Sequence, residues 1–353
     1  MNYIETLYFI GKCLTLAHED KNRTEIKQIL ETDNVDWDSV VKVSTAHYVF
    51  PALYCNFREL NYLKFLPKDL SEYMIHIYNL NHERNLEIIK QVQEVNMLFT
   101  ENNITAIFLK GSGNLIEGLY NNIGERMIGD IDILVSLKDY KKSIEILKKD
   151  GYSRREHVPK FTFLNKHYPR IVKKNSICSV EIHSDMLMKP HNSFFNYSQV
   201  FKNIKKTSSN VFVLSYKDQI IYNCFNKQIN DKAQWYKNNS LRNSYDIFLL
   251  SKKESVIKTL QEFRYHFNYL NNYVASSSLL FNKTESLDFY KNIHTQKFLT
   301  TEKLYLVNPK IKKINKLRYD IFFYFNVRIT ILRHSLFDKN TRKILLKRLR
   351  TSS

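Results

Sequence analysis

Residues 104–135 read ITAIFLKGSGNLIEGLYNNIGERMIGDIDILV, and this stretch decides the fold class. It begins with a short apolar run of strand-forming residues and ends with a second one, which carries Asp130 and Asp132 at alternate positions. Between the two runs, five of the seven glycines of the chain fall within nineteen positions. Glycine tolerates positive φ and lets a ligand approach the main chain closely, so this concentration predicts special backbone geometry. The pattern indicates a strand, a glycine-rich loop, a helix and a second strand.

The flanking sequence has a different periodicity. Apolar residues recur at helical spacing from residue 1 to about 100 and again from 216 to the end. Between these regions, 138–149 predicts a helix, and 161–164, 170–173 and 177–183 predict short strands. We therefore predict an α+β protein, with a mixed sheet and helices as its core and with helical regions on both sides. The expected divisions are an N-terminal helical region 1–100, an α/β core 101–210 and a helical C-terminal domain 211–353.

Composition narrows the class of protein. The four cysteines form no Cys-x-x-Cys pair, which argues against a zinc cage or a disulfide framework. A membrane helix needs roughly 18 apolar residues in a row, and the sequence contains no such run. The N-terminus lacks the basic start and the small-residue cleavage site of a secretory signal. We expect a soluble, cytoplasmic protein without membrane insertion.

The net charge of +19 indicates an anionic partner, whether a nucleotide, a nucleic acid or an acidic lipid. Its distribution is uneven, since residues 309–353 hold thirteen lysines and arginines against two acids. This basic tail predicts a surface for RNA, DNA or another phosphate-rich partner. A solvated basic helix face without a partner is the alternative, because such faces are common.

The acidic pair points to a metal. Side chains alternate along a strand, so Asp130 and Asp132 project to the same side, where two like charges repel. A hard cation with oxygen ligands relieves that repulsion. We predict that this cation is Mg²⁺, with Mn²⁺ as an alternative. A third acid, Glu181, shares a face with His183 in a nearby predicted strand. Three acids are enough to hold two ions together with the phosphates of a nucleoside triphosphate.

A phosphate-binding loop lies just upstream of this pair. Residues 110–113, Lys-Gly-Ser-Gly, follow the first strand and precede a helix that we expect to begin near Asn114. Such a loop aims backbone N–H groups and the positive end of a helix at a triphosphate. An aspartate pair beside it fits Mg²⁺, which takes part of its coordination from substrate phosphates.

These residues carry a resemblance to a known family. The matching segments are 109–112 (Leu-Lys-Gly-Ser), Arg126, 129–135 (Gly-Asp-Ile-Asp-Ile-Leu-Val), 151–152 (Gly-Tyr), 167–169 (His-Tyr-Pro) and 180–183 (Val-Glu-Ile-His). Together they resemble a family of uncharacterised nucleotidyltransferases in the polymerase β superfamily, over roughly residues 45 to 250. The resemblance implies a polymerase β-like core.

The resemblance also implies roles for single residues. Gly111 and Ser112 would form the triphosphate loop, and Asp130, Asp132 and Glu181 would be the metal ligands and the catalytic carboxylates. The glycine-serine pair usually lies closer to the aspartates in the wider superfamily, so the longer insertion here affects the loop geometry.

The sequence leaves more than one role open for several other residues. Lys110 and Arg126 either neutralise phosphate charge or form ion pairs with the acids. His183 orients the third acid, contacts the acceptor or is a structural histidine. Arg242 and Asp246, four apart on a predicted helix, either pair with each other or approach the cleft from the C-terminal domain, and their spacing favours the pair.

The predicted activity is the transfer of a nucleoside monophosphate from an NTP, such as ATP, to an acceptor hydroxyl, with release of pyrophosphate. The acceptor is a small molecule, a protein or an RNA, and the basic tail favours RNA. Two alternatives stay open: a regulatory protein that binds NTP without turnover, and a toxin-like or defence-type transferase that modifies a tRNA or a protein.

Overall fold

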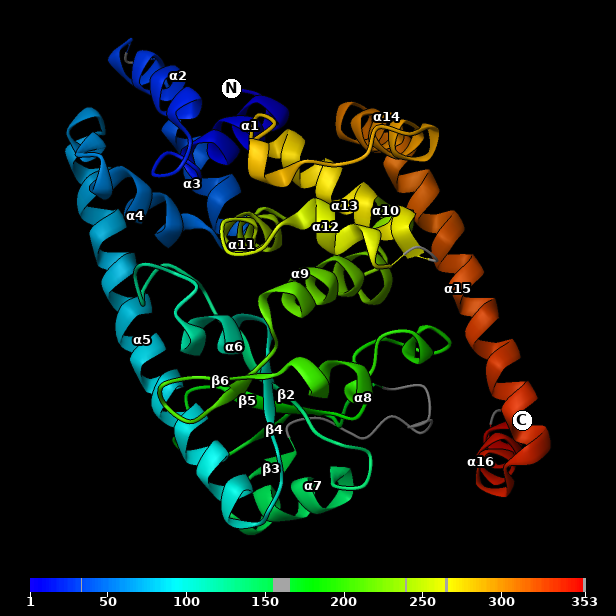
Figure 1. Ribbon diagram of the computed structural model, residues 1–353. Coiled ribbons are helices and arrows are strands. Elements are labelled where there is room, and N and C mark those ends of the chain that lie inside the picture. The colour runs from blue at the N-terminus through cyan, green and yellow to red at the C-terminus, as the bar shows by residue number, and fades with distance from the viewer. Residues whose placement is uncertain (33, 155–165, 239, 264–265, 352–353) are drawn as a thin grey trace.

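The computed structural model describes residues 1–32, 34–154, 166–238, 240–263 and 266–351. It has the predicted α+β architecture, in which a seven-stranded mixed sheet is flanked by N-terminal and C-terminal helical regions (Figure 1). The predicted strand at 161–164 lies outside the described residues. The predicted division at residue 210 lies just before the last strand of the sheet, and the three domain limits remain a proposal.

In the described part of the first hundred residues, helices dominate: α1 (Tyr3–Cys13), α2 (Asp20–Glu31), α3 (Trp37–Ala46), α4 (Phe50–Glu59), the short η1 (Tyr62–Phe65) and α5 (Lys68–Glu101). Pro51 lies in the first turn of α4 and Pro67 caps α5, so both prolines begin helices, where a missing N–H costs little. Helix α5 runs along one side of the molecule and contacts α4, α6 and α7 (Figure 1).

The sheet has the strand order β3-β4-β5-β2-β1-β7-β6. Its elements are β1 (Ile107–Leu109), α6 (Lys110–Glu117), β2 (Asp130–Leu134), α7 (Tyr140–Lys149), β3 (Ser153–Arg154), β4 (Ile171–Val172), β5 (Ser179–His183), η3 (His191–Ser193), α8 (Tyr197–Val200), η4 (Phe201–Asn203), β6 (Lys205–Lys206) and β7 (Phe212–Val213). Strand β2 lies in the centre, parallel to β5 and antiparallel to β1. One face of β2 and β5 carries the fully buried Ile131, Ile133, Val180 and Ile182. The opposite face is left for the polar side chains.

Helix α6 begins earlier than the sequence suggested. It begins at Lys110, so Gly111 and Gly113 lie in its first turn and not in a preceding loop. A Cβ on Gly113 would lie 2.4 Å from the carbonyl oxygen of Phe108, which no real side chain tolerates. Glycine at 113 therefore serves the close packing of the helix start on β1.

The C-terminal region consists of α9 (Tyr216–Phe225), the π-helical η5 (Asn226–Asn230), α10 (Ala233–Tyr236), α11 (Leu241–Ser251), α12 (Val256–Gln261), α13 (Phe267–Leu280), η7 (Glu285–Leu287), α14 (Ile293–Val307), α15 (Pro309–Phe337) and α16 (Lys339–Thr351). Helix α15 contacts α10 and α14, and α16 packs at its far end (Figure 1). None of the helices in the described ranges combines the length and apolar character needed to cross a bilayer.

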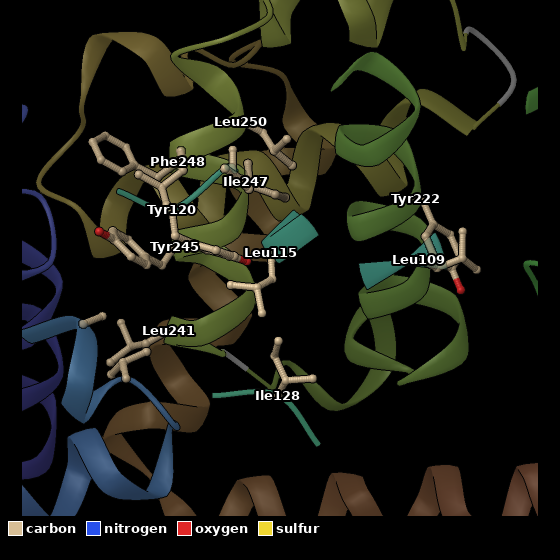
Figure 2. Packing of buried hydrophobic residues seen from close by; sticks show 14 of the residues in the cluster. Leu109, Leu115, Tyr120, Ile128, Tyr222, Leu241, Tyr245, Ile247, Phe248 and Leu250 are labelled. Carbon is tan, nitrogen blue, oxygen red and sulfur yellow. The ribbon is translucent and has the colours of Figure 1, made fainter. Parts of the chain in front are cut away.

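A shared hydrophobic core fixes the C-terminal helices to the sheet region. Figure 2 shows Leu115 of α6 and Ile128 in the same buried cluster as Tyr245 and Phe248 of α11. Burying side chains of this size stabilises the contact by about 1.5–3 kcal/mol each. The sheet and α11 are therefore held together as the two walls of the site described below.

Candidate active site

The two acidic strands meet in register. Asp132 of β2 is paired with Glu181 of the parallel strand β5, so both side chains project from the same face of the sheet. Both are buried, and ligand atoms of Asp132, Glu181 and His183 all lie within 4.8 Å of one another. Two carboxylates and an imidazole at this separation could hold a metal ion.

Asp130 lies two residues along the same face and is more exposed. Its carboxylate does not belong to the group of three, and it binds Arg170, whose Nη2 lies 3.0 Å from Oδ2. The Nε of the same guanidinium donates to Oε1 of Glu181 over 2.8 Å. Arg170 thus bridges Asp130 and Glu181, and it keeps Asp130 close to the buried pair of Asp132 and Glu181.

Asp132 has two basic partners. Nζ of Lys110 donates to its Oδ1 over 2.6 Å, and Nε2 of His183 donates to the same oxygen over 2.8 Å. Nε2 of His183 also lies 3.5 Å from Oε2 of Glu181, while its buried Nδ1 has no hydrogen-bond partner among the described residues. His183 therefore orients both carboxylates, which is one of the roles that the sequence left open.

These contacts set the charges of the site. Burial alone would raise the pKa of Asp132, but Lys110 and His183 hold it far below its usual value. Burial would lower the pKa of Lys110, yet the charge of Asp132 keeps it above its usual value. Burial and the charges of Asp132 and Glu181 raise the pKa of Asp130. Asp132 is therefore ionised and Lys110 protonated at neutral pH.

Residues 110–112 start α6 beside the acids. Lys110 adopts φ 52°, a left-handed conformation that is unfavourable for a non-glycine residue, and its ammonium reaches Asp132 from there. Gly111 lines the cleft, where a Cβ on this residue would lie 3.8 Å from the guanidinium of Arg126. The hydroxyl of Ser112 donates to the Leu109 carbonyl over 3.1 Å within the buried turn, so it does not face the cleft.

A cleft of about 590 Å³ opens in front of the aspartates. Asp130 and Asp132 line it from the sheet, while Glu181 is not among its lining residues. The other walls come from α5, from the segment before β2, from α9 and α11, and from the turn before α4: Tyr48, Asn81, Arg84, Arg126, Met127, Ile128, Gly129, Tyr222, Arg242, Asn243 and Asp246. A cleft of this volume holds a nucleotide.

Arg126 is tied to the wall of this cleft. Its Nε and Nη2 donate to Oδ1 and Oδ2 of Asp246 over 2.8 and 2.7 Å, and Tyr120 donates to the same carboxylate. The pair joins the segment before β2 to α11. The predicted pairing of Asp246 with Arg242 is therefore wrong, because the carboxylate turns toward the sheet region. Of the two roles predicted for Arg126, the structure shows an ion pair, but its partner is Asp246 and not one of the three predicted metal ligands.

Helix α5 holds the segment that carries Arg126. Nδ2 of Asn81 donates to the Gly124 carbonyl over 2.8 Å, and Nδ2 of Asn85 donates to the Arg126 carbonyl over the same distance. Nη1 of Arg84 donates to the Ile128 carbonyl over 2.5 Å. Three polar side chains on one face of α5 thus satisfy carbonyls of a long irregular segment and fix the entry into β2.

Arg170 is the main site residue that the motif reasoning missed. The sequence contained a signal for this contact, namely two successive predicted strands at 170–173 and 177–183. In the structure, β4 and β5 are antiparallel, with Ile171 opposite Val180. Counting one pair further places Arg170 opposite Glu181. Reading the two predicted strands as one hairpin would have found this contact.

A sequence model of a family described as uncharacterised nucleotidyltransferases matches residues 33–262. The chain belongs to this nucleotidyltransferase family. The match covers β1, and β2 and β5 with their acids. It also covers the turn at Tyr48 and helices α5, α9 and α11, which supply other walls of the cleft. No curated protein matches the sequence significantly. Family membership confirms the resemblance and makes nucleotidyl transfer the general activity, while it names neither substrate nor acceptor.

Proposed function

We propose that this chain is a magnesium-dependent nucleotidyltransferase that moves a nucleoside monophosphate from an NTP to an acceptor hydroxyl. The observation that carries the proposal is the pairing of Asp132 with Glu181 on neighbouring strands, beside a cleft with several cationic side chains. A non-catalytic nucleotide-binding protein would not need two buried carboxylates in contact with the same histidine, since buried charges are costly.

The donor atoms fit a divalent ion. Asp132 and Glu181 would hold it, Asp130 would share a second ion from the same face, and His183 would orient the carboxylates or give its nitrogen to Mn²⁺. When bound, Mg²⁺ supplies positive charge that polarises the phosphates and lowers the pKa of the acceptor hydroxyl. Lys110 and Arg170 would then be free to turn from the acids to phosphate oxygens.

The first turn of α6 supports the triphosphate. The first N–H groups of a helix have no partner within the helix, and they lie at the positive end of its dipole. Residues 110–113 form that turn, directly beside Asp132, and Gly111 leaves the main chain accessible from the cleft. We assign phosphate binding to the backbone of Gly111 and Ser112 and to the ammonium of Lys110.

The reaction is an in-line displacement. The acceptor oxygen forms a bond to the α-phosphorus, and the bond from that phosphorus to the oxygen that bridges it to the β-phosphorus breaks. Pyrophosphate leaves with the bonding electrons, and the hydroxyl proton passes to water. The protein contributes positioning and charge, which account for most of the catalysis in phosphoryl transfer.

We propose RNA as the acceptor class, because helices α15 and α16 carry the excess of basic residues. A small molecule or a protein would not need such a surface. The proposal places the reaction in the cytoplasm, where NTPs and RNA are both available. A transferase that modifies a tRNA in a toxin or defence system has the same chemistry and differs only in its target.

Pyrophosphate release tests the proposal. The wild-type chain, incubated with Mg²⁺, each NTP and total RNA, should release pyrophosphate and label the RNA when the NTP is α-³²P-labelled. The D132N variant should release none while it keeps its far-UV circular dichroism. Binding of NTP by the wild type, without any turnover across all four NTPs and all acceptors, would contradict the transferase and favour a regulatory protein.

A further inference from the structure

Tyr48 occupies a backbone position that normally takes glycine. It follows the C-cap of α3, and its N–H donates to the Thr45 carbonyl while the N–H of Val49 donates to Ser44. This is the Schellman ending of a helix, whose residue beyond the cap adopts the left-handed conformation, and Tyr48 has φ 57°. A non-glycine residue in that conformation costs about 1–2 kcal/mol. The turn itself therefore gains nothing from tyrosine.

The side chain of Tyr48 lies at the rim of the cleft. It lines the cleft and remains 52% exposed. Its neighbour His47 fixes the turn to α11, because Nδ1 accepts a hydrogen bond from the N–H of Leu241 over 3.3 Å. The aromatic ring is thus held against the helix that forms the far wall.

The next residue of α11 covers one face of this ring. The guanidinium carbon of Arg242 lies 4.9 Å from the centroid of the Tyr48 ring, a cation–π contact. Nε of Arg242 is buried and has no hydrogen-bond partner among the described residues. Burial lowers the pKa of Arg242, and the charge of Arg126 lowers it further, while Asp246 and Asp130 oppose these effects. Arg242 is thus a cation within reach of the acids, with unused hydrogen-bonding capacity.

The groups that line the cleft match the chemical parts of a nucleotide. The aspartates and the start of α6 offer a site for phosphates, and Arg242 lies within electrostatic range of Asp130. Tyr48 lines the same cleft, and about half of the residue stays accessible to a ligand. Aromatic rings in that position bind planar bases by stacking, which contributes about 1–3 kcal/mol per base.

We propose that Tyr48 is the platform for the base of the bound nucleotide and that Arg242 supports its ring from the opposite face. This inference rests on the proposed function for the position of the phosphates. Every base has a π-face, so the platform provides affinity and little choice between bases. The unfavourable backbone conformation of Tyr48 is kept for this contact and not for the fold.

Replacement by glycine separates the two roles. Tyr48→Gly relieves the left-handed strain, so we expect its unfolding free energy, measured in urea, to equal or exceed that of the wild type. We expect its affinity for NTP with Mg²⁺, measured by calorimetry, to fall about tenfold or more. Its affinity for inorganic tripolyphosphate with Mg²⁺ should not change, because that ligand has no base. Tyr48→Trp is the matched control and should keep NTP affinity.

The outcomes are distinct. Equal NTP affinity of wild type and Tyr48→Gly would overturn the inference, even if pyrophosphate release is normal. Loss of tripolyphosphate affinity in Tyr48→Gly would also overturn it, because the residue would then act on the phosphates. A tenfold loss of NTP affinity alone, in a protein that binds NTP but releases no pyrophosphate, would support the platform while the proposed activity fails.

Arg242→Met tests the support of the ring. We expect a smaller loss of NTP affinity than in Tyr48→Gly and no loss of tripolyphosphate affinity. Equal losses of both affinities would assign Arg242 to the phosphates.

Discussion

Asp132 and Glu181 lie side by side on parallel strands, although 48 residues separate them in the sequence, and His183 contacts both. Each strand is short and carries two apolar residues on the opposite face, where Ile131, Ile133, Val180 and Ile182 are fully buried. A slip of one residue in either strand would move a carboxylate into that core. The hydrophobic packing of the sheet therefore enforces the convergence of the acids, and their mutual repulsion is offset by Lys110 and Arg170.

Asp132 is the residue whose loss should damage the site most. In Asp132→Asn, we expect pyrophosphate release to fall roughly 100-fold or more, because a metal ligand is removed. The change also removes the carboxylate that pairs with Lys110, so we expect a loss of stability of about 1–3 kcal/mol. Pyrophosphate assays and urea unfolding of the same preparation measure the two effects. Full activity in a folded Asp132→Asn protein would refute the assignment.

His183 should act through the carboxylates. His183→Ala removes the donor that orients Asp132 and Glu181, and loss of such a supporting contact typically weakens metal binding about 10–100-fold. We expect Mn²⁺ affinity, measured by electron paramagnetic resonance, to fall within that range. His183→Gln places an amide N–H at a similar reach and should recover part of the affinity. Identical Mn²⁺ affinities in wild type and His183→Ala would show that the histidine is structural only.

The sequence predicted the core of the site because its strands follow simple rules. Alternation along residues 130–135 and 179–183 placed the carboxylates on one face, and the apolar partners determined which face is buried. The family resemblance then supplied the pairing of the two strands, which local patterns do not give. The helical flanks were also predictable, since their periodicity extends over many turns.

The remaining contacts depend on tertiary distances. Asp246 pairs with Arg126, which lies 120 residues away in the sequence. Helical spacing favoured Arg242 as its partner, because such spacing relates only residues of the same helix. Gly111 and Gly113 predicted a loop, while the structure uses them inside a helix that packs closely on β1. The place of Tyr48 at the cleft follows from the meeting of α3 with α11, for which the sequence held no periodic signal.

The buried pair of Arg126 and Asp246 should be sensitive to the loss of one partner. Arg126→Met leaves a carboxylate buried beside Tyr120 without its ion-pair partner, and loss of one partner of a buried pair typically costs about 3–5 kcal/mol. The double variant Arg126→Met, Asp246→Asn removes both charges and should regain most of that stability. Urea unfolding of both variants measures the difference. Equal stabilities of the single and double variants would show that the pair contributes no electrostatic coupling.

Glu302 should make the stability of the protein depend on pH. Burial raises its pKa to about 7 from a usual value of 4.5, and the Ser276 hydrogen bond and nearby lysines offset only part of this effect. The folded carboxyl therefore holds its proton more tightly than the unfolded one, so the contribution of Glu302 to stability is full below about pH 4.5 and falls as pH rises to about 7.

The Glu302→Gln variant isolates this effect because it lacks the titrating group. We expect the unfolding free energy of the wild type, minus that of the variant, to fall by roughly 3 kcal/mol between pH 4.5 and 8. Urea unfolding at several pH values measures the difference, in which the other titrating groups cancel. A difference that stays constant with pH would show that the carboxyl titrates normally.

The basic tail should control the salt dependence of RNA binding. Residues 339–353 contain six lysines and arginines and no acid, and residues 339–351 form α16 beyond the long helix α15. Each phosphate contact releases counterions, so log K falls with log salt by about 0.7 per contact for a single strand. Deleting 339–353 should therefore reduce that slope by up to about 4, while it leaves NTP turnover with a small acceptor unchanged. Filter binding of a short RNA from 50 to 300 mM salt measures the slope. An unchanged slope would assign the basic residues to a solvated helix surface, and the acceptor would then have to be sought among small molecules and proteins.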